Sequence, residues 1–295
     1  MKKVCCLPCE ERFDRNDKLA NFKSPVTLYV SCRFTDFSIM TKPVLHWVME
    51  GAGPTVVLSH ALGCSLSMWD GVAARLKDHF TVLRYDHRGH GRSEAPPGPY
   101  TLQMLADDAA GLIAAQASGP VHFVGLSMGG MTAQALAAHH PHLVKSVVIA
   151  NAANGYDGAA RVMWRTRIDT VRARGVAAIA DGAMQRWFTP AFRADAAGAV
   201  RVAALRAELE QTDAAAYAAS CEAVASMDFR ESNSRIRCPA LVIAGTLDEA
   251  TPPALSEAIA ASIQGAQLRK IEAAHLSAVE KPKAFAALLR DFLAA

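Results

Sequence analysis

The sequence predicts an α/β protein with a mostly parallel central sheet, helices on both faces and a helical insertion over the sheet. Three observations support this class. Apolar runs of strand length alternate with helix-length segments from about residue 42 onward. The tight turn GLSMG, at residues 125–129, separates one such run from a helix, and the alternation stops over residues 152–234, where only helical segments occur. Crossover-length connections favour parallel strands.

The length, composition and net charge of the chain exclude several classes of protein. The chain has 295 residues, 51% of them hydrophobic and 20% charged, which is typical of a globular protein with a large core. The formal net charge is only +3, and no basic stripe suggests nucleic acid. No apolar run approaches the roughly 20 residues of a membrane span. We therefore expect neither nucleic acid nor a membrane as a partner.

The first 39 residues differ from the rest of the chain. They mix charged residues with Cys, Pro and Asn, show no sustained period and lack the apolar segment of a secretory signal. We expect a poorly ordered extension over residues 1–39, or a stretch upstream of the native start, with folding beginning near Met40. Alternatively, Cys5, Cys6 and Cys9 in this segment supply half of the ligands of a metal site. Seven unpatterned cysteines favour reduced thiols and a cytoplasmic location.

The run at residues 55–59 is continuously apolar, as buried parallel strands are, whereas residues 45–49 look like an edge strand. The helices between the predicted strands include residues 102–116 and the segment after the turn at residues 125–129. This pattern assigns residues 40–151 and 235–295 to the sheet-containing core and residues 152–234 to a helical cap. The predicted strands cover residues 45–49, 55–59, 80–85, 121–124, 143–149, 240–245 and 267–271.

The turn at residues 125–129 places Ser127 between a strand and a helix. Glycines on both sides of the serine allow the strand and the helix to pack closely around a sharp turn. Such a turn raises the serine Oγ above the carboxyl edge of the sheet, near the positive end of the helix dipole. A glycine-rich turn without chemistry is the alternative. Because suitable partners follow later in the chain, we interpret Ser127 as a nucleophile.

A serine nucleophile needs a base that takes its proton and an acid that orients the base. In this architecture both follow the serine, acid before histidine, in loops at the carboxyl ends of strands. Asp248 and His275 each follow a predicted strand in that order. Glu249 and Asp228 are alternative acids. The order and the positions predict a triad of Ser127, His275 and Asp248.

Attack on an ester carbonyl creates an oxyanion that needs preorganised N–H donors. One donor is expected from the backbone of Met128, directly after the nucleophile, and the other from the loop after the second predicted strand, where Leu62 is the best candidate. His60 in that loop is expected to hold it by hydrogen bonds. Metal catalysis by His60, His87 and His90 is an alternative, but their spacing is not that of a metal site, and we expect no metal or cofactor.

Motifs beyond the triad recur along the chain from about residue 42. They include LSMW at 66–69, LRYD at 83–86, RGHG at 88–91, PPGPYT at 96–101, TRIDTV at 166–171, RWFTP at 186–190, TPP at 251–253 and AHLS at 274–277. With the triad, these motifs resemble the α/β-hydrolase superfamily over residues 42–293. Within it the chain is most similar to the 3-oxoadipate enol-lactonases of the β-ketoadipate pathway, which degrades aromatic compounds. The cap motifs carry most of that likeness, because caps choose substrates.

The resemblance implies an α/β-hydrolase fold and the opening of 3-oxoadipate enol-lactone to 3-oxoadipate through an acyl-enzyme. The substrate is a small anionic lactone, whose carboxylate needs a cation in an otherwise apolar pocket. We place Arg167 there, with Trp164 and Trp187 as pocket walls. A cap ion pair for Arg167 and core packing of the tryptophans are the alternatives.

The same fold and triad serve other functions. A general carboxylesterase, another lactonase or a perhydrolase-like enzyme is the alternative within the hydrolases. A further alternative is a small-molecule receptor that retains the triad but does not catalyse a reaction. The sequence does not indicate an oligomeric state.

Overall fold

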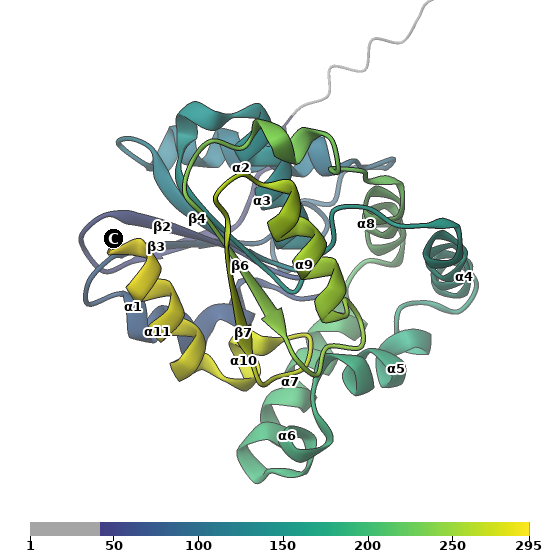
Figure 1. Ribbon diagram of the computed structural model, residues 1–295. Helices are drawn as coiled ribbons and strands as arrows, with labels where there is room; N and C mark the ends of the chain where they lie inside the picture. Colours follow the sequence, from purple (N-terminus) through teal and green to yellow (C-terminus); the bar gives the residue numbers. More distant parts are fainter. Residues whose placement is uncertain (1–41, 295) are drawn as a thin grey trace, which may run out of the picture. The chain divides into compact units, whose positions relative to one another are not determined.

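A single seven-stranded sheet forms the centre of the computed structural model, which describes residues 42–294 (Figure 1). The predicted extension at residues 1–39 lies outside the described residues. The strand order is β1-β3-β2-β4-β5-β6-β7, and every neighbouring pair is parallel except β1 with β3. The mostly parallel sheet is confirmed. The strands are β1 (Trp47–Glu50), β2 (Thr55–Ser59), β3 (Thr81–Tyr85), β4 (Val121–Leu126), β5 (Val144–Ala150), β6 (Ala240–Gly245) and β7 (Gln267–Ile271).

The antiparallel strand β1 occupies one edge of the sheet. Only residues 51–54 connect it to β2. This connection is too short for the crossover that a parallel neighbour requires. The chain therefore turns back past β3, and β1 pairs with β3 in the register Trp47 to Tyr85. The strands β2, β4, β5 and β6 are buried almost throughout, which explains their mainly apolar sequences.

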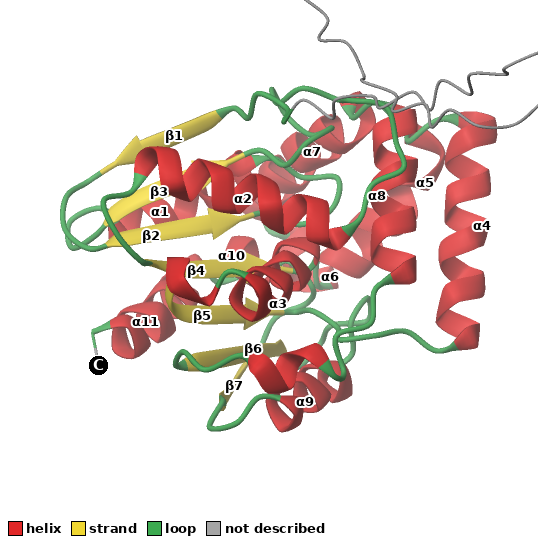
Figure 2. Ribbon diagram, turned by 90° about the horizontal axis from the view of Figure 1, so that it is seen from above, coloured by secondary structure: helices red, strands yellow, loops and turns green. Residues whose placement is uncertain are grey.

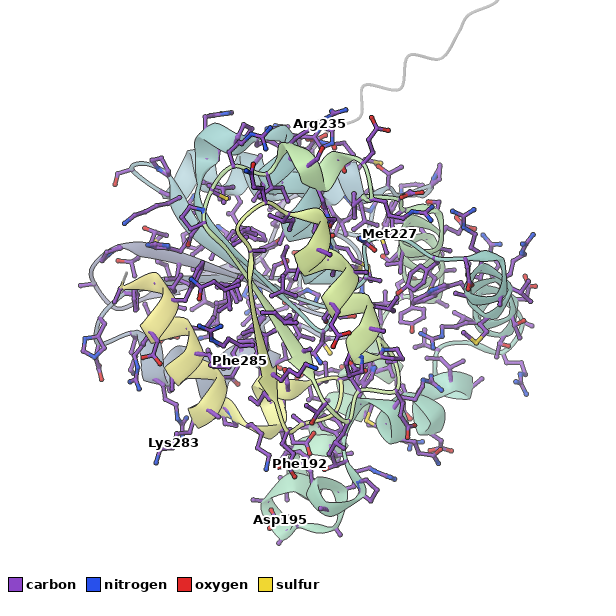
Figure 3. All side chains as sticks on the ribbon, viewed as in Figure 1. Phe192, Asp195, Met227, Arg235, Lys283 and Phe285 are labelled. Atoms are coloured by element: carbon purple, nitrogen blue, oxygen red, sulfur yellow. The ribbon has the colours of Figure 1, made fainter. Side chains whose placement is uncertain are left out.

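Helices cover both faces of the sheet (Figures 1 and 2). One face carries α1 (Asp70–Leu76), α10 (Ser277–Glu280) and α11 (Pro282–Leu293), and the other carries α2 (Leu102–Gln116), α3 (Met128–His139) and α9 (Pro253–Ser262). On the first face Phe285 is fully buried and its ring lies 5.9 Å from that of Trp69 (Figure 3). Short 3₁₀ turns complete the core at η1 (Leu66–Trp69), η2 (Pro141–Leu143) and η3 (Ser232–Arg235).

Five helices between β5 and β6 lie at the end of the sheet to which the parallel strands point (Figure 2). Four of them begin at a side chain that accepts a hydrogen bond from the first turn, namely Asp157, Thr189, Asp195 and Asp213. Such caps satisfy N–H groups that the helix itself leaves unpaired. No helix among residues 42–294 is both long and apolar enough to cross a bilayer. The helices are α4 (Gly158–Arg174), α5 (Ala177–Trp187), α6 (Pro190–Ala194), α7 (Ala196–Gln211) and α8 (Ala214–Ser226).

Candidate active site

Ser127 stands on a sharp turn between β4 and α3. Its backbone has φ 57° and ψ −117°, in the left-handed range that side chains rarely adopt. The Ser127 N–H donates to the carbonyl of Ala150 at 2.9 Å, which holds the turn against β5. The turn needs Gly125 and Gly129, because a Cβ at either position would lie 2.0 Å from a backbone oxygen. The structure therefore holds the serine in a strained conformation with its side chain partly exposed.

The three predicted catalytic side chains form one chain of hydrogen bonds. His275 Nδ1–H donates to Asp248 Oδ2 at 2.9 Å, and its other ring nitrogen, Nε2, lies 2.9 Å from Ser127 Oγ. With the proton fixed on Nδ1, Nε2 accepts the serine hydroxyl proton. Both His275 and Asp248 are buried, at 4% and 3% exposure. The geometry is that of a nucleophile, a base and an orienting acid.

Several groups besides His275 hold the carboxylate of Asp248. Asn151 Nδ2 donates to its Oδ2 at 2.9 Å and Thr251 Oγ1 donates to the same oxygen at 2.7 Å, while two backbone N–H groups of the following loop donate to Oδ1. Ser277 Oγ in turn donates to Asn151 Oδ1 at 2.6 Å. Burial pushes the pKa of Asp248 upward, but the charge and hydrogen bond of His275, followed by the hydrogen bonds from Thr251 and Asn151, outweigh it and hold the pKa below its ordinary value.

The alternative acids lie elsewhere. Glu249 lines the cavity in front of the serine, but the His275 ring donates to the carboxylate of Asp248. Asp228 forms an ion pair with Arg230 near the end of the cap segment. Neither side chain is placed to orient the base.

The predicted oxyanion donors lie on either side of the serine. Met128 is the first residue of α3, where a backbone N–H has no acceptor within its own helix. Among residues 42–294, no acceptor takes the N–H of Leu62, and this residue lines the cavity beside Ser127. Both N–H groups are therefore available to a ligand, and their role as an oxyanion hole stays a prediction.

The neighbouring histidines are structural. His60 Nδ1–H donates to the carbonyl of Ala61 at 2.8 Å, and its Nε2 accepts the N–H of His87 at 2.9 Å, so His60 holds the loop of Leu62 as expected. His87 Nε2 lies 2.8 Å from the hydroxyl of Ser59. Among the described residues, no group of three His, Cys, Asp or Glu side chains is arranged to hold a metal ion.

Because these histidines are buried, we expect the free energy of unfolding to fall in mild acid. Burial lowers the pKa of His60 and of His87, and it lowers the pKa of His90 to about 3. Below their ordinary pKa of 6.5 these histidines take up protons in the unfolded chain but not in the folded one. Each therefore lowers the free energy of unfolding by about 1.4 kcal/mol per pH unit until its folded pKa is reached. Urea unfolding between pH 7.5 and pH 4.5 measures the slope.

A matched variant isolates one histidine. His90→Asn keeps a donor for the carbonyl of Arg88, which His90 Nδ1 contacts at 3.1 Å, but it cannot titrate. We expect its slope below pH 6 to be shallower than that of the unsubstituted protein by about 1.4 kcal/mol per pH unit. An identical slope in the two proteins would contradict this explanation.

A cavity of about 570 Å³ opens in front of the serine. Ser127, His275 and Leu62 line it on the core side, and Trp164 and Arg167 line it on the cap side. This volume lies in the range of pockets that hold small organic ligands. The cavity therefore brings the predicted nucleophile together with the predicted substrate-binding residues.

The cap wall contains two arginines beside aromatic rings. The Arg167 guanidinium lies 4.7 Å from the ring centre of Trp164, and Trp187 lines the same cavity while being largely buried. Arg186, which the sequence did not single out as a binding residue, also lines the cavity. Burial, and then repulsion by Arg167, lowers the pKa of Arg186. Neither arginine forms an ion pair within the described part of the chain, whose ion pairs involve other residues.

A model of the α/β hydrolase fold matches residues 54–282. The chain belongs to the α/β-hydrolase family. The predicted fold is thus confirmed both by the sheet and by the family match.

Several α/β hydrolases are similar over most of their length. 3-Oxoadipate enol-lactonase 2 of Acinetobacter baylyi is 40% identical over 232 residues, which are 79% of this chain and 85% of that protein. The crystal structure of the enol-lactonase from Burkholderia xenovorans LB400 has a TM-score of 0.82 and 39% identity, covering 86% of this chain and 98% of that chain. The putative carbamate hydrolase RutD of Yersinia enterocolitica is 32% identical, over 82% of this chain and 88% of that protein. The family therefore establishes a hydrolase, while its members differ in substrate.

Sequence reasoning missed the polar residues around the triad of this α/β hydrolase. Asn151 has φ 46°, and such a conformation in a buried asparagine directly after a strand is a signal that only the structure reveals. Thr251 follows Asp248 by three residues, a spacing at which a side chain and a loop N–H often meet the same carboxylate. That spacing was the one signal visible in the sequence.

Proposed function

We propose that this α/β hydrolase is a serine hydrolase that opens 3-oxoadipate enol-lactone to 3-oxoadipate. The main observation behind the proposal is the hydrogen-bonded chain of Ser127, His275 and Asp248 at the floor of a cavity. The cap wall of this cavity holds two arginines that form no ion pair among residues 42–294. The two enol-lactonases with about 40% identity over most of the chain support this substrate. The reaction belongs to the β-ketoadipate pathway of aromatic compound degradation.

The acylation step uses the triad. Ser127 Oγ attacks the lactone carbonyl while His275 Nε2 takes the hydroxyl proton, and the carboxylate of Asp248 stabilises the imidazolium that forms. The backbone N–H groups of Leu62 and Met128 meet the oxyanion, each contributing about 3 kcal/mol to the transition state. Collapse breaks the ring ester bond. The ring oxygen takes the proton of the His275 imidazolium and leaves as an enol, which tautomerises to the ketone, and His275 is neutral again.

Deacylation completes the cycle. His275 removes a proton from a water molecule, and the resulting hydroxide attacks the acyl carbonyl through the same oxyanion site. Collapse of this intermediate breaks the bond to Ser127 and returns a proton to its Oγ. The second carboxylate of the product is formed at this step. The chain needs no cofactor for either half of this reaction.

The cap provides the means to recognise the acetate arm. Arg167 is the proposed partner of the substrate carboxylate, because it lines the cavity and forms no ion pair among residues 42–294. Trp164 and Trp187 supply apolar walls for the ring. Arg186 is a second cation in the same wall. A small anionic lactone fits this combination of charge and apolar surface.

A cytoplasmic location accords with this proposal. The three cysteines within residues 42–294, Cys64, Cys221 and Cys238, are all free thiols. Free thiols are typical of a reducing compartment. The small anionic lactone is the only partner that the proposal requires.

Loss of enol-lactone absorbance with purified protein tests the proposed function directly. Turnover of the lactone far above that of p-nitrophenyl acetate supports the assignment. Turnover of the ester alone rejects the substrate but keeps the serine hydrolase, and a carboxylesterase or a hydrolase of another lactone then becomes the better description. No turnover of either substrate by the folded protein rejects the serine hydrolase.

Arg167→Ala is expected to weaken binding of the anionic lactone selectively. Loss of a charged hydrogen bond of about 1.5–3 kcal/mol raises KM for the lactone by about 10- to 100-fold. KM for neutral p-nitrophenyl acetate stays unchanged. Arg165→Ala is the matched control, because Arg165 lies exposed on the same helix and does not line the cavity. Equal effects on the two substrates, or equal effects of the two variants, would remove Arg167 from the proposal.

A further inference from the structure

The loop that carries His275 is anchored on both sides of the histidine. The N–H of Leu276 donates to the backbone carbonyl of Trp187 at 3.0 Å. The N–H of Ala274 donates to Oε2 of Glu280 at 3.0 Å. Trp187 ends the cap helix α5, whereas Glu280 ends the core helix α10. One anchor of the catalytic loop is therefore a residue of the cap.

The second anchor also connects to the cap. Glu280 is buried at 8% exposure, and its other oxygen, Oε1, accepts a hydrogen bond from the hydroxyl of Thr189. The same hydroxyl accepts the N–H of Phe192 at 3.2 Å, where Thr189 caps α6. Glu280 forms no ion pair with any residue of the described range 42–294. Neutral hydrogen bonds from Thr189 and Ala274 therefore hold this buried carboxylate.

Two residues shortly before Thr189 line the cavity. Arg186 and Trp187 line it together with Ser127 and His275. The ring of Trp187 also lies 3.6 Å from the point where a Cβ would stand on Gly63, in the loop of the proposed oxyanion donor. A ligand that packs against the end of α5 thus contacts Trp187, whose carbonyl anchors the histidine loop and which lies two residues before Thr189.

We propose that Thr189 and Glu280 are positioning residues that couple the substrate-contacting end of α5 to the alignment of His275. When the end of α5 is held by a substrate, the carbonyl of Trp187 and the hydroxyl of Thr189 fix the backbone on both sides of the base. His275 Nε2 then stays within hydrogen-bond distance of Ser127 Oγ. Small misplacements of a catalytic group have large effects on rate, so this device acts on kcat rather than on binding. The inference rests on the proposed serine hydrolase reaction.

Three variants separate positioning from simple stabilisation of the cap. Thr189→Val keeps the shape of the side chain but removes the hydroxyl, and Thr189→Ser restores it. Glu280→Gln keeps the volume but replaces one acceptor oxygen with a donor. Asp195→Ala is the control, because Asp195 caps the neighbouring helix α7 and has no contact with the histidine loop; Figure 3 shows it at the far end of the cap. Each variant is assayed on the enol-lactone and on p-nitrophenyl acetate, and its melting temperature is recorded.

The proposal predicts a specific pattern of kcat, KM and melting temperature among these variants. Thr189→Val and Glu280→Gln lower kcat on the lactone by about tenfold with little change in KM, and they lower kcat on the small ester less, because acetate does not reach the cap. Thr189→Ser restores kcat. Asp195→Ala lowers the melting temperature but not kcat.

Three outcomes would overturn the proposal. They are a fall in kcat for Asp195→Ala as large as that for Thr189→Val, failure of Thr189→Ser to restore kcat, or an effect confined to KM. If the unsubstituted protein hydrolyses only the ester, the proposed substrate fails by itself. The fall in ester kcat for Thr189→Val and its recovery in Thr189→Ser then still test the positioning role.

Discussion

Ser127→Ala is expected to lower kcat/KM by about 10⁵-fold or more, because removal of the nucleophile leaves only binding and the oxyanion donors to accelerate the reaction. The fold is expected to persist. Alanine removes only the Oγ, whose hydrogen-bond partner among residues 42–294 is His275, and the Ser127 N–H still donates to Ala150. Rates of lactone and ester hydrolysis, with the melting temperature beside them, check this expectation.

Two further variants and a covalent probe test whether the loss of activity is due to loss of the nucleophile. Ser234→Ala removes an exposed serine in η3 and leaves both rates unchanged. The double variant Ser127→Ala with His275→Ala is hardly slower than Ser127→Ala alone, because the two side chains act as one unit. A fluorophosphonate probe labels the unsubstituted protein but not Ser127→Ala. Turnover that survives in Ser127→Ala, or labelling at another residue, would show that Ser127 is not the nucleophile.

Gly129→Ala is expected to prevent normal folding. A Cβ at this position would lie 2.0 Å from the carbonyl oxygen of Ser59 and 2.9 Å from that of His60. These are backbone atoms at the end of β2, so no side chain can rotate away to make room. Overpacking of a rigid core costs about 3 kcal/mol or more, so we expect either insoluble protein or a melting temperature lower by about 6 °C or more.

Gly119→Ala is the control for this loss of stability. Gly119 lies in the connection between α2 and β4, and a Cβ there would meet no atom within 4 Å. This variant is expected to fold and melt like the unsubstituted protein. A soluble Gly129→Ala protein with an unchanged melting temperature would mean that α3 leaves room for a Cβ beside the end of β2.

Features that depend on residues close together in the chain could be predicted from the sequence. The inner strands were visible as mainly apolar runs, whereas β7 (QLRKI) carries charged residues and was placed by its position after the sixth predicted strand and before the terminal helix. The shift of the first strand from residues 45–49 to Trp47–Glu50 is an edge effect, since an edge strand is only half buried. The order of Ser127, Asp248 and His275 along the chain was likewise visible, because each follows a strand. The structure brings these three side chains together.

The supporting residues could not be predicted in this way. Asn151 contacts Asp248 across 97 positions of the chain, and Thr189 contacts Glu280 across 91. A buried asparagine or glutamate has no periodic signature, and its partners become neighbours only when the sheet and the cap assemble. Arg186 was overlooked for a related reason, because a cationic residue on a helix is usually solvated and only the cavity shows otherwise.

The placement of the cap between β5 and β6 has a consequence for how new specificities arise. The proposed substrate-binding side chains all come from one uninterrupted segment, whereas the nucleophile, acid and base are encoded outside it. Exchange of that single segment between related genes can therefore change the substrate while leaving the reaction chemistry intact. The junction is not free of constraint, because an incoming segment must again provide a hydroxyl facing Glu280 and a carbonyl facing Leu276. Recombination is thus expected to succeed when donor and recipient share these two contacts.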